Sequence, residues 1–371
     1  MSAAFTIGVE EEYQIINPET RALMGLSNSL IESNQQAHTT QAVVHELYCC
    51  QVEIATDICQ TLDDVRQALV QARTVVTAAA QKNGVAIAAA GTHPFSDWHD
   101  QAVTPKDRYY ALQDDLKRIV RELIIFGCHV HVGIDDREMA VQVVNRARVW
   151  LPTLLALTAN SPFWLGEDTG YDSYRMEMWC RLPTAGPPPV FQDYADYQSF
   201  IQRLIDIGIT DDPTKIYWDI RLSERYPTVE FRMADVCTSI DEAVMLAGLI
   251  RALAHTCYQD AHTDQPFTAA RAELLKAAMW QSARHGLQGD LIDFTTLQSV
   301  PAKDRVRSLL DYIKPALEHY GDWDVVSQQV SDIFMHGNSA QRQRQIYEET
   351  GRYEAVVDYL IEQGAATLAM A

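Results

Sequence analysis

The sequence predicts an α+β fold with a mixed or mainly antiparallel sheet in residues 5–235 and a helical C-terminal third. Short segments in which polar and apolar residues alternate recur through residues 5–235, as expected for strands. These segments do not alternate with helices as regular βαβ units, which argues against a doubly wound parallel sheet. The rest of the chain has helical patterns without a Pro/Gly-rich linker or a repeat, so we expect residues 1–371 to form one domain.

The first strand is expected in FTIGVEEEYQII, residues 5–16. Its apolar residues recur at every second position and share one face, and its polar residues share the other. Three adjacent carboxylates stand within this pattern, and alternation puts Glu10 and Glu12 on the polar face and Glu11 on the apolar face. For Glu11 we expect a structural role, paired with a basic residue on the other face of the sheet.

The segments that follow are interpreted in the same way. Residues 48–56 alternate and form a second expected strand, with Glu53 on its polar face. Residues 61–81 have helical spacing and begin with an N-cap signal. The small residues of 84–95 indicate a strand that ends in a turn, and a helix is expected at 109–122.

Another strand is expected within LIIFGCHVHVGID, residues 123–135, where alternation places His129 and His131 on the same side. Residues 137–159 have a helical pattern, and Pro152 predicts a kink in it.

The segment 160–191 is rich in Gly, Pro and aromatic residues, which is typical of a long functional loop. Its aromatic side chains either cap the pocket or anchor the loop in the core. Two alternating strands follow at 217–224 and 227–236 and are separated by a short turn. A capping box at Ser239 and Glu242 then opens a long helix.

Composition narrows the class of protein. Of the 371 residues, 47% are hydrophobic and 22% are charged, as in ordinary soluble globular proteins. The net charge of −20 and the pI of about 4.9 argue against a nucleic-acid partner and against an anionic membrane surface. The seven cysteines form no CxxC, the N-terminus has no signal-peptide pattern and no apolar stretch is long enough to span a bilayer, so we expect a cytoplasmic protein with reduced thiols.

The expected strands share a second feature, a set of ionisable residues on their polar faces. This set comprises Glu10, Glu12, Glu53, His129, His131, Asp219, Arg221, Glu230 and Arg232. A solvent-facing side of a sheet would also be polar, although its usual residues are Lys, Thr, Ser and Gln. If the strands are neighbours, these carboxylate, imidazole and guanidinium groups converge on one concave surface.

Such a surface fits metal-assisted chemistry on phosphates. Carboxylates that gather without compensation raise one another's pKa values, and a divalent cation removes that conflict. Oxygen-rich ligation with an occasional imidazole suits Mg²⁺ or Mn²⁺, and arginine binds phosphate or carboxylate groups. The chain has no GxxxxGK[ST], GxGxxG, GxSxG or HExxH motif, so ATP phosphates would be held by metal and side chains.

Several segments carry a resemblance to a known family. In chain order they are GVEEEY, VEIAT, GTHPF, GCHVHVG, DTGYDSYR, YWDIRLSERYPTVEFRMAD and LAGLIRALAH, and they span nearly the whole chain. The sequence resembles the glutamate–cysteine ligase type 2 family, the YbdK-like carboxylate–amine ligases. The resemblance implies a glutamine-synthetase-like fold, in which helices pack on the outer face of a curved, mainly antiparallel sheet. It also implies a homodimer and a concave face that holds ATP, Mg²⁺ (or Mn²⁺) and an amino acid.

The resemblance implies roles for individual residues as well. The implied metal ligands are Glu10, Glu12, Glu53, His129 and Glu230. His131 is implied as a phosphate contact, and Arg232 as a group that binds the substrate carboxylate or the transferred phosphate. Arg175 and Arg221 match basic positions of the family pattern, so we assign both to catalysis together with Arg232, and we assign Arg221 and Arg232 to ATP binding as well.

The expected function is an ATP-dependent carboxylate–amine ligase that forms an amide through an acyl phosphate, with glutamate and cysteine as the reference pair of substrates. Three alternatives stay open. They are a phosphoryl transferase of the guanidino-kinase type, a metal-dependent hydrolase that uses His129 and His131, and a nucleotide-binding protein with little turnover. Thr92 and His93, in GTHPF, either line the pocket or meet the requirements of a turn.

Overall fold

The computed structural model describes residues 5–36 and 43–369. At the centre of this described part lies an antiparallel sheet of seven strands. Six strands lie in the order β2-β3-β1-β5-β9-β8, and β4 pairs with β1. Every pairing in this sheet is antiparallel, so the predicted sheet type is confirmed. The strand bounds are β1 Ile7–Ile16, β2 Val43–His45, β3 Gln51–Ala55, β4 Ala86–Ala88, β5 Gly127–Gly133, β8 Ile220–Leu222 and β9 Thr228–Asp235.

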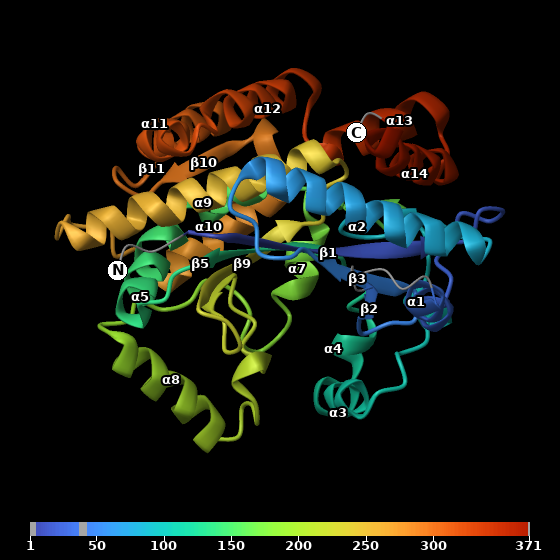
Figure 1. The fold of residues 1–371 in the computed structure, drawn as a ribbon, viewed down its shortest axis with the longest axis horizontal. Coiled ribbons are helices and arrows are strands. Elements are labelled where there is room, and N and C mark those ends of the chain that lie inside the picture. The colour runs from blue at the N-terminus through green and yellow to red at the C-terminus, as the bar shows by residue number, and fades with distance from the viewer. Residues whose placement is uncertain (1–4, 37–42, 370–371) are drawn as a thin grey trace.

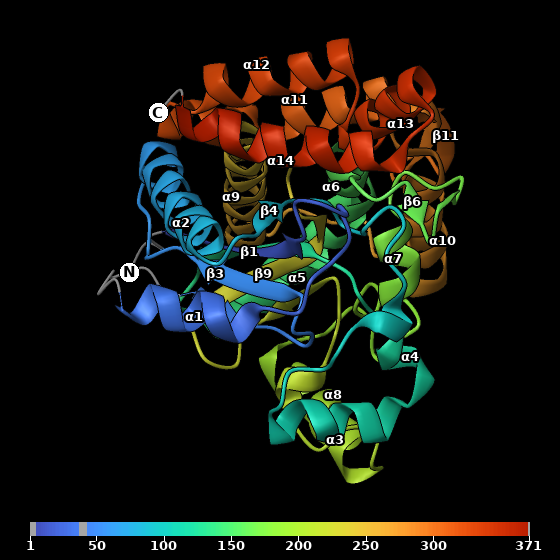
Figure 2. The ribbon, with the colours of Figure 1, turned by 90° about the vertical axis from the view of Figure 1, so that its right-hand side faces the viewer.

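Helices cover one face of this sheet, as predicted (Figures 1 and 2). Helices α2 and α9 lie directly against the sheet, α11 and α12 pack on α9, and α14 packs on α2 and β4. Helices α3, α4 and α8 lie on the opposite side of the sheet (Figure 1). The bounds are α1 Ser27–Gln36, α2 Leu62–Lys82, α3 Asp107–Leu116, α4 Arg118–Arg121, α5 Arg137–Ala147, α6 Leu151–Thr158, α7 Tyr174–Trp179, α8 Tyr194–Asp206, α9 Ile240–His262, α10 Ala272–His285, α11 Ala302–Tyr320, α12 Trp323–His336, α13 Ser339–Thr350 and α14 Tyr353–Ala369.

Two helix starts are defined by local chemistry. The Thr61 side chain accepts a hydrogen bond from the Asp64 N–H, and Asp64 in turn accepts from the Thr61 N–H, which closes a capping box at the start of α2. Ser239 and Glu242 make the same reciprocal pair at the start of α9. Helix α2 buries an apolar stripe, whereas α9 is buried on all sides along most of its length, between the sheet and α11 and α12. The caps fix where each helix begins.

Two predicted helices are interrupted in the structure. The helix expected at 109–122 is divided between α3 and α4, because Lys117 between them adopts a positive φ of 51°. The kink predicted in 137–159 takes the form of a 3₁₀ turn, Arg148–Trp150, between α5 and α6. Pro152 lies in the first turn of α6, where its missing N–H costs no hydrogen bond.

Other elements depart from the prediction. The strand expected within 84–95 is only three residues long, and the loop 160–191 contains helix α7 and the hairpin β6 Phe163–Trp164 and β7 Glu167–Asp168. The sequence prediction did not include α1, β2, α8 or the hairpin of β10 Asp290–Asp293 and β11 Gln298–Pro301. Among the described helices, none combines the length and the apolar character needed to cross a lipid bilayer.

Candidate active site

A cavity of about 610 Å³ lies on the face of the sheet opposite to α2 and α9. Its volume is within the range of roughly 300–1,000 Å³ that is usual for small-molecule sites. The sheet forms its floor, and residues of α3 and of the segment 214–226 form part of its walls. Every residue to which the sequence assigned a site role borders it, namely Glu10, Glu12, Glu53, His129, His131, Arg175, Arg221, Glu230 and Arg232.

The register of the sheet explains why these side chains meet. Directly opposed residues of antiparallel strands point to the same face. The pairing of β1 with β5 puts Glu10 opposite His129, and the pairing of β1 with β3 puts Glu12 opposite Glu53. On the other side of β5, His131 lies opposite Glu230 of β9, which also faces Arg221 of β8.

One group of three residues has the geometry of a cation site. Single ligand atoms of Glu10, His131 and Glu230 all lie within 4.8 Å of one another. Burial on its own would raise the pKa of Glu10, but its contacts with His129 (Nδ1 to Oε2, 3.2 Å) and His131 (Nε2 to Oε1, 3.3 Å) outweigh burial and lower it. Glu10 is therefore a carboxylate at neutral pH, which is the form that binds a cation.

The two histidines differ in their surroundings. The pKa of His129 is lowered to about 4 by burial and by the charge of Arg232, so its imidazole is neutral. Its Nδ1 faces Glu10, and its Nε2 is buried with no hydrogen-bond partner in the described part of the chain, as expected of a nitrogen that is available to a ligand. His131 contacts Glu10 on one side and the Thr228 hydroxyl on the other (3.0 Å), and the geometry places His131 rather than His129 in the group of three.

A second cluster of carboxyl groups lies beside the first. It consists of Glu12, Glu53 and a residue that the sequence interpretation missed, Glu46, which follows the short strand β2. Burial and the charge of Glu46 raise the pKa of Glu12 to about 7. Burial and the charges of Glu46, Glu10 and Glu12 raise the pKa of Glu53 well above its usual range, and burial raises that of Glu46. A divalent cation would remove this conflict among like charges.

Arg221 is held firmly at the edge of the cavity. Its Nε donates to Glu230 Oε2 (2.8 Å), and its Nη1 donates to the carbonyl oxygens of Thr214 (2.8 Å) and Ile216 (2.7 Å). The other oxygen of Glu230 accepts from Arg232. Burial would raise the pKa of Glu230, but the two guanidinium groups outweigh it and hold the pKa low.

Arg175 and Arg232 flank the ring of Trp179, at 5.6 Å and 5.3 Å from its centroid. Arg175 approaches Gly127 so closely that any Cβ there would overlap its guanidinium group, which explains the glycine. Its hydrogen bonds to the carbonyls of Met233 and Arg232 are long, at 3.4 Å. These guanidinium groups give a chain of net charge −20 a local site for an anionic ligand.

Glu11 points to the opposite face and has a different environment. Its carboxylate is buried in a bidentate pair with Arg73 of α2, with distances of 2.5 Å and 3.0 Å. Arg73 also donates to the carbonyls of Cys237 and Thr238, both at 2.9 Å. The expectation that Glu11 pairs with a basic residue on the other face of the sheet is confirmed.

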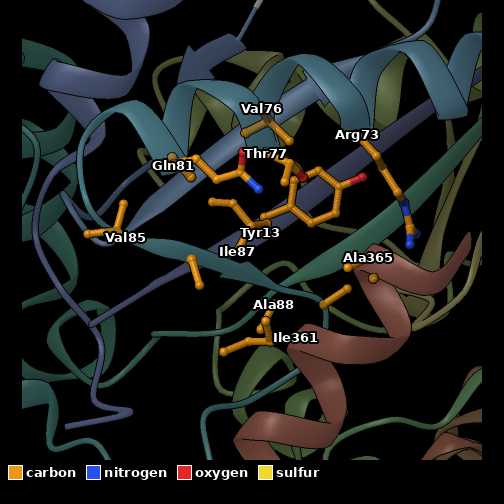
Figure 3. A pocket seen from close by; sticks show the side chains of 14 residues that line it. Tyr13, Arg73, Val76, Thr77, Gln81, Val85, Ile87, Ala88, Ile361 and Ala365 are labelled. Atoms are coloured by element: carbon orange, nitrogen blue, oxygen red, sulfur yellow. The ribbon is translucent and has the colours of Figure 1, made fainter. Parts of the chain in front are cut away.

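A smaller cavity, of about 110 Å³, lies on this helix-covered side, between α2, β4 and α14 (Figure 3). Figure 3 shows mainly apolar side chains around it, among them Val76, Ile87 and Ile361. Its lining, which lies entirely within the described residues, contains no carboxylate or imidazole. This cavity therefore lacks the anionic and imidazole ligands that the larger cavity offers.

Thr92, His93 and Asp219 lie outside the lining of the larger cavity. Both ring nitrogens of His93 bind the backbone, since Nε2 donates to the Arg21 carbonyl and Nδ1 accepts from the Ser96 N–H, both at 2.9 Å. The Thr92 hydroxyl donates to the Phe163 carbonyl (2.8 Å). Neither residue borders the larger cavity, so the turn interpretation fits them. Asp219 is fully buried beside the cavity rather than on its surface.

Comparison with known proteins gives consistent results. The model of glutamate–cysteine ligase family 2 (GCS2) matches residues 6–359. A protein named as a candidate glutamate–cysteine ligase 2 from Rhodopirellula baltica is 42% identical over 345 residues, covering 91% of this chain and 92% of that protein. One of the same name from Herpetosiphon aurantiacus is 38% identical over 359 residues, covering 97% of this chain and 93% of that protein.

Solved structures share the fold. The glutamate–cysteine ligase of Francisella tularensis, in complex with AMP, has a TM-score of 0.71 at 14% identity and covers 100% of this chain and 94% of its own. The bifunctional glutathione synthetase of Pasteurella multocida has a TM-score of 0.75 at 15% identity, covering 99% of this chain and 52% of its own. At these identities the likeness establishes the fold alone, and it confirms the predicted α+β class.

Proposed function

The chain belongs to glutamate–cysteine ligase family 2, and from this premise we propose that it is an ATP-dependent ligase that joins a carboxylate to an amine through an acyl phosphate. The observation that carries the proposal is the composition of the 610 Å³ cavity. Carboxylate and imidazole groups from β1, β3, β5 and β9 line the site together with the guanidinium groups of Arg175, Arg221 and Arg232. This combination suits phosphoryl transfer from a nucleotide.

We assign two cation positions to the carboxylates. Glu10, His131 and Glu230 form the first, to which the unpartnered Nε2 of His129 adds a fourth candidate ligand. We place the second at Glu12, Glu46 and Glu53, which line the same cavity. Burial is the first cause of their raised pKa values, and a divalent cation would supply a counter-charge. Mg²⁺ or Mn²⁺ bound at these positions would neutralise negative charge on the phosphates of ATP.

The basic residues bind the anionic parts of the substrates. Arg221 and Arg232 border the cavity next to the first cation position, where they can donate to phosphate oxygens. Arg175 and Arg232, stacked on Trp179, present a pair of guanidinium groups to the transferred phosphoryl group or to the substrate carboxylate. The AMP complex of the Francisella tularensis relative supports a nucleotide in this fold.

The reaction proceeds in two displacements. An oxygen of the substrate carboxylate attacks the γ-phosphorus, an O–P bond forms, the bond from that phosphorus to the β-phosphate oxygen breaks, and ADP leaves. The amine nitrogen of the second substrate then attacks the acyl carbon, loses a proton and expels phosphate to give the amide. The guanidinium groups stabilise the charge on the phosphoryl group in both steps, which is the principal contribution a protein makes to such transfers.

The names of the curated relatives suggest glutamate as the carboxylate substrate and cysteine as the amine. We propose this pair as the first to be tested. The single catalytic domain over residues 1–371, the homodimer and the cytoplasmic location stay predictions.

The test is an assay for ADP release with a panel of amino acids, in which each carboxylate is offered with and without each amine. We expect release that needs both partners and Mg²⁺ or Mn²⁺. The Glu12→Gln variant should lose this activity, whereas Glu177→Gln, which changes a carboxylate of α7 outside the cavity lining, should keep it. A phosphorylated product that accumulates without an amine would instead indicate a phosphoryl transferase. Activity without nucleotide would indicate a hydrolase, and nucleotide binding with no release would indicate a binding protein.

A further inference from the structure

Asp219 is a carboxyl group that neither lines the cavity nor belongs to either cation position. It is fully buried, and neither of its carboxylate oxygens has a hydrogen-bond partner among the residues that the structure describes. Its backbone is nevertheless held tightly, because its N–H donates to the Gly186 carbonyl (3.0 Å) and its carbonyl accepts from the Arg232 N–H (2.8 Å). A buried carboxyl group with two bare oxygens is costly, so its retention at a fixed position needs an explanation.

The sheet register places Asp219 directly opposite Arg232. Strands β8 and β9 pair Arg221 with Glu230 and Ile220 with Phe231, and the hydrogen bond from Arg232 continues this register by one residue. Directly opposed residues share a face, with Cβ atoms about 4.5–5.5 Å apart. Asp219 is thus the cross-strand carboxylate of Arg232, yet the guanidinium group of Arg232 contacts Glu230 on its own strand instead.

Glu230 is shared between two arginines, and these differ in how they are held. Arg221 keeps two carbonyl acceptors in addition to Glu230 Oε2. Among the described residues, Glu230 Oε1 is the one hydrogen-bond acceptor of the Arg232 side chain, and Arg232 Nε is buried without a partner. A cation that takes an oxygen of Glu230 therefore displaces Arg232 rather than Arg221.

We propose that Asp219 is a positioning residue that receives the guanidinium group of Arg232 when a divalent cation takes Glu230. The inference rests on the cation site of the proposed function. A buried guanidinium group deprived of its carboxylate would be strongly destabilising, and Asp219 supplies the replacement on the same face of the sheet. Burial raises the pKa of Asp219 to about 7 against the opposing charges of Arg175 and Arg232, so a closer approach of Arg232 would favour its ionised form.

The test is the affinity of the full-length protein for Mn²⁺ alone, measured from the electron paramagnetic resonance signal of the free ion. The Mn²⁺ sites of interest are those that the wild type has and the Glu230→Gln variant lacks. We expect Asp219→Asn to weaken Mn²⁺ binding at these sites about tenfold, as is usual when a residue behind a metal ligand is changed. Arg232→Gln should tighten binding, because it removes the competitor for Glu230, and Asp219→Asn should have no further effect in that background.

Glu177→Gln is the matched control, since burial also raises the pKa of Glu177 but its charge partner is Lys276. Wild-type affinity in Asp219→Asn, or an equal loss in the Arg232→Gln background, would overturn the role of Asp219. Asparagine has the shape of a protonated carboxyl group, so Asp219→Asn should fold. If it does not fold, the Arg232→Gln variant alone decides. Mn²⁺ binding by Arg232→Gln that is weaker than or equal to that of the wild type then overturns the proposal. The titration contains no nucleotide or amino acid, so a failed ligase assay leaves its result intact, whereas absence of Mn²⁺ binding by the wild type would contradict both proposals.

Discussion

On one face of β1, Glu11 is buried against a guanidinium group that is anchored to two carbonyl oxygens; on the other, Glu10 and Glu12 face histidines and further carboxyl groups. The three residues are consecutive and chemically identical. The sheet separates them because successive side chains of a strand point to opposite faces. What differs is the partner that each face supplies.

The partners of each carboxyl group distinguish those that stabilise the fold from those that belong to the site. Glu11 and Arg73 form a matched pair, and although burial would lower the pKa of Arg73, the charge of Glu11 outweighs burial and raises it. Glu12 has no guanidinium partner within hydrogen-bond distance, and its one hydrogen bond among the described residues comes from the Gly127 N–H (2.7 Å). A cluster of unmatched carboxyl groups costs stability, and such costs are characteristic of functional sites.

The largest effect on stability is expected from Glu11→Gln. This change leaves the buried guanidinium group of Arg73 without a counter-charge, which costs about 3–5 kcal/mol in comparable pairs. Urea unfolding monitored by circular dichroism should show that loss. As a control, Glu273→Gln breaks an ion pair that is exposed on both sides and should change stability by less than about 0.5 kcal/mol. If the two variants are equally stable, Glu11 does not support the fold in the way described.

Glu230→Gln should show an intermediate loss and thereby sharpen the comparison. Glu230 belongs to the site face, yet it is paired with two arginines. Arg221 would keep its carbonyl acceptors, whereas Arg232 would lose the charge of its carboxylate partner and keep a neutral amide oxygen or the carboxyl group of Asp219, so we expect a loss of about 1–3 kcal/mol together with the loss of ADP release. Unfolding and activity should be measured on the same preparation. Unchanged stability would mean that the arginines find other partners.

Of the three substitutions, Glu12→Gln should change the free energy of unfolding least below pH 4.5. As the pH rises toward 7, the variant should become more stable than the wild type. The pKa of Glu12 is raised from 4.5 to about 7, so its stabilising contribution is complete below pH 4.5 and is lost as the pH rises through 7. In the presence of a chelator, the variant should therefore gain about 1–3 kcal/mol relative to the wild type between pH 4.5 and pH 7. If the difference in unfolding free energy between the variant and the wild type is the same across this range, the pKa of Glu12 is not raised by folding.

The sequence was sufficient for the features that local rules control. Strand alternation separated Glu11 from Glu10 and Glu12, and the capping boxes at Thr61 and Ser239 located the starts of α2 and α9. The roles of the site residues came from the family resemblance and stay predictions, but the residues themselves do gather around one cavity.

The sequence was not sufficient where long-range pairing decides. Glu46 follows a three-residue strand that has no visible alternation, and it reaches the site because β2 pairs with β3. The choice of His131 over His129 for the group of three depends on the register between β5 and β9, which carries an irregularity between Cys128 and Val130. Helix α8 has an N-cap at Asp193 and an apolar stripe that includes Tyr197 and Ile201, so this helix could have been predicted.

The most direct test of the central claim is the number of protons released when Mg²⁺ binds at pH 7. It is obtained by isothermal titration calorimetry in two buffers with different ionisation enthalpies. Glu12 and Glu53 have raised pKa values and hold protons near neutrality, so a cation that replaces those protons should release about one or more of them. Glu11→Gln should release the same number and Glu12→Gln fewer. Binding of Mg²⁺ without proton release would contradict the account, because the carboxyl groups of the site face would then already be ionised and compatible without the cation.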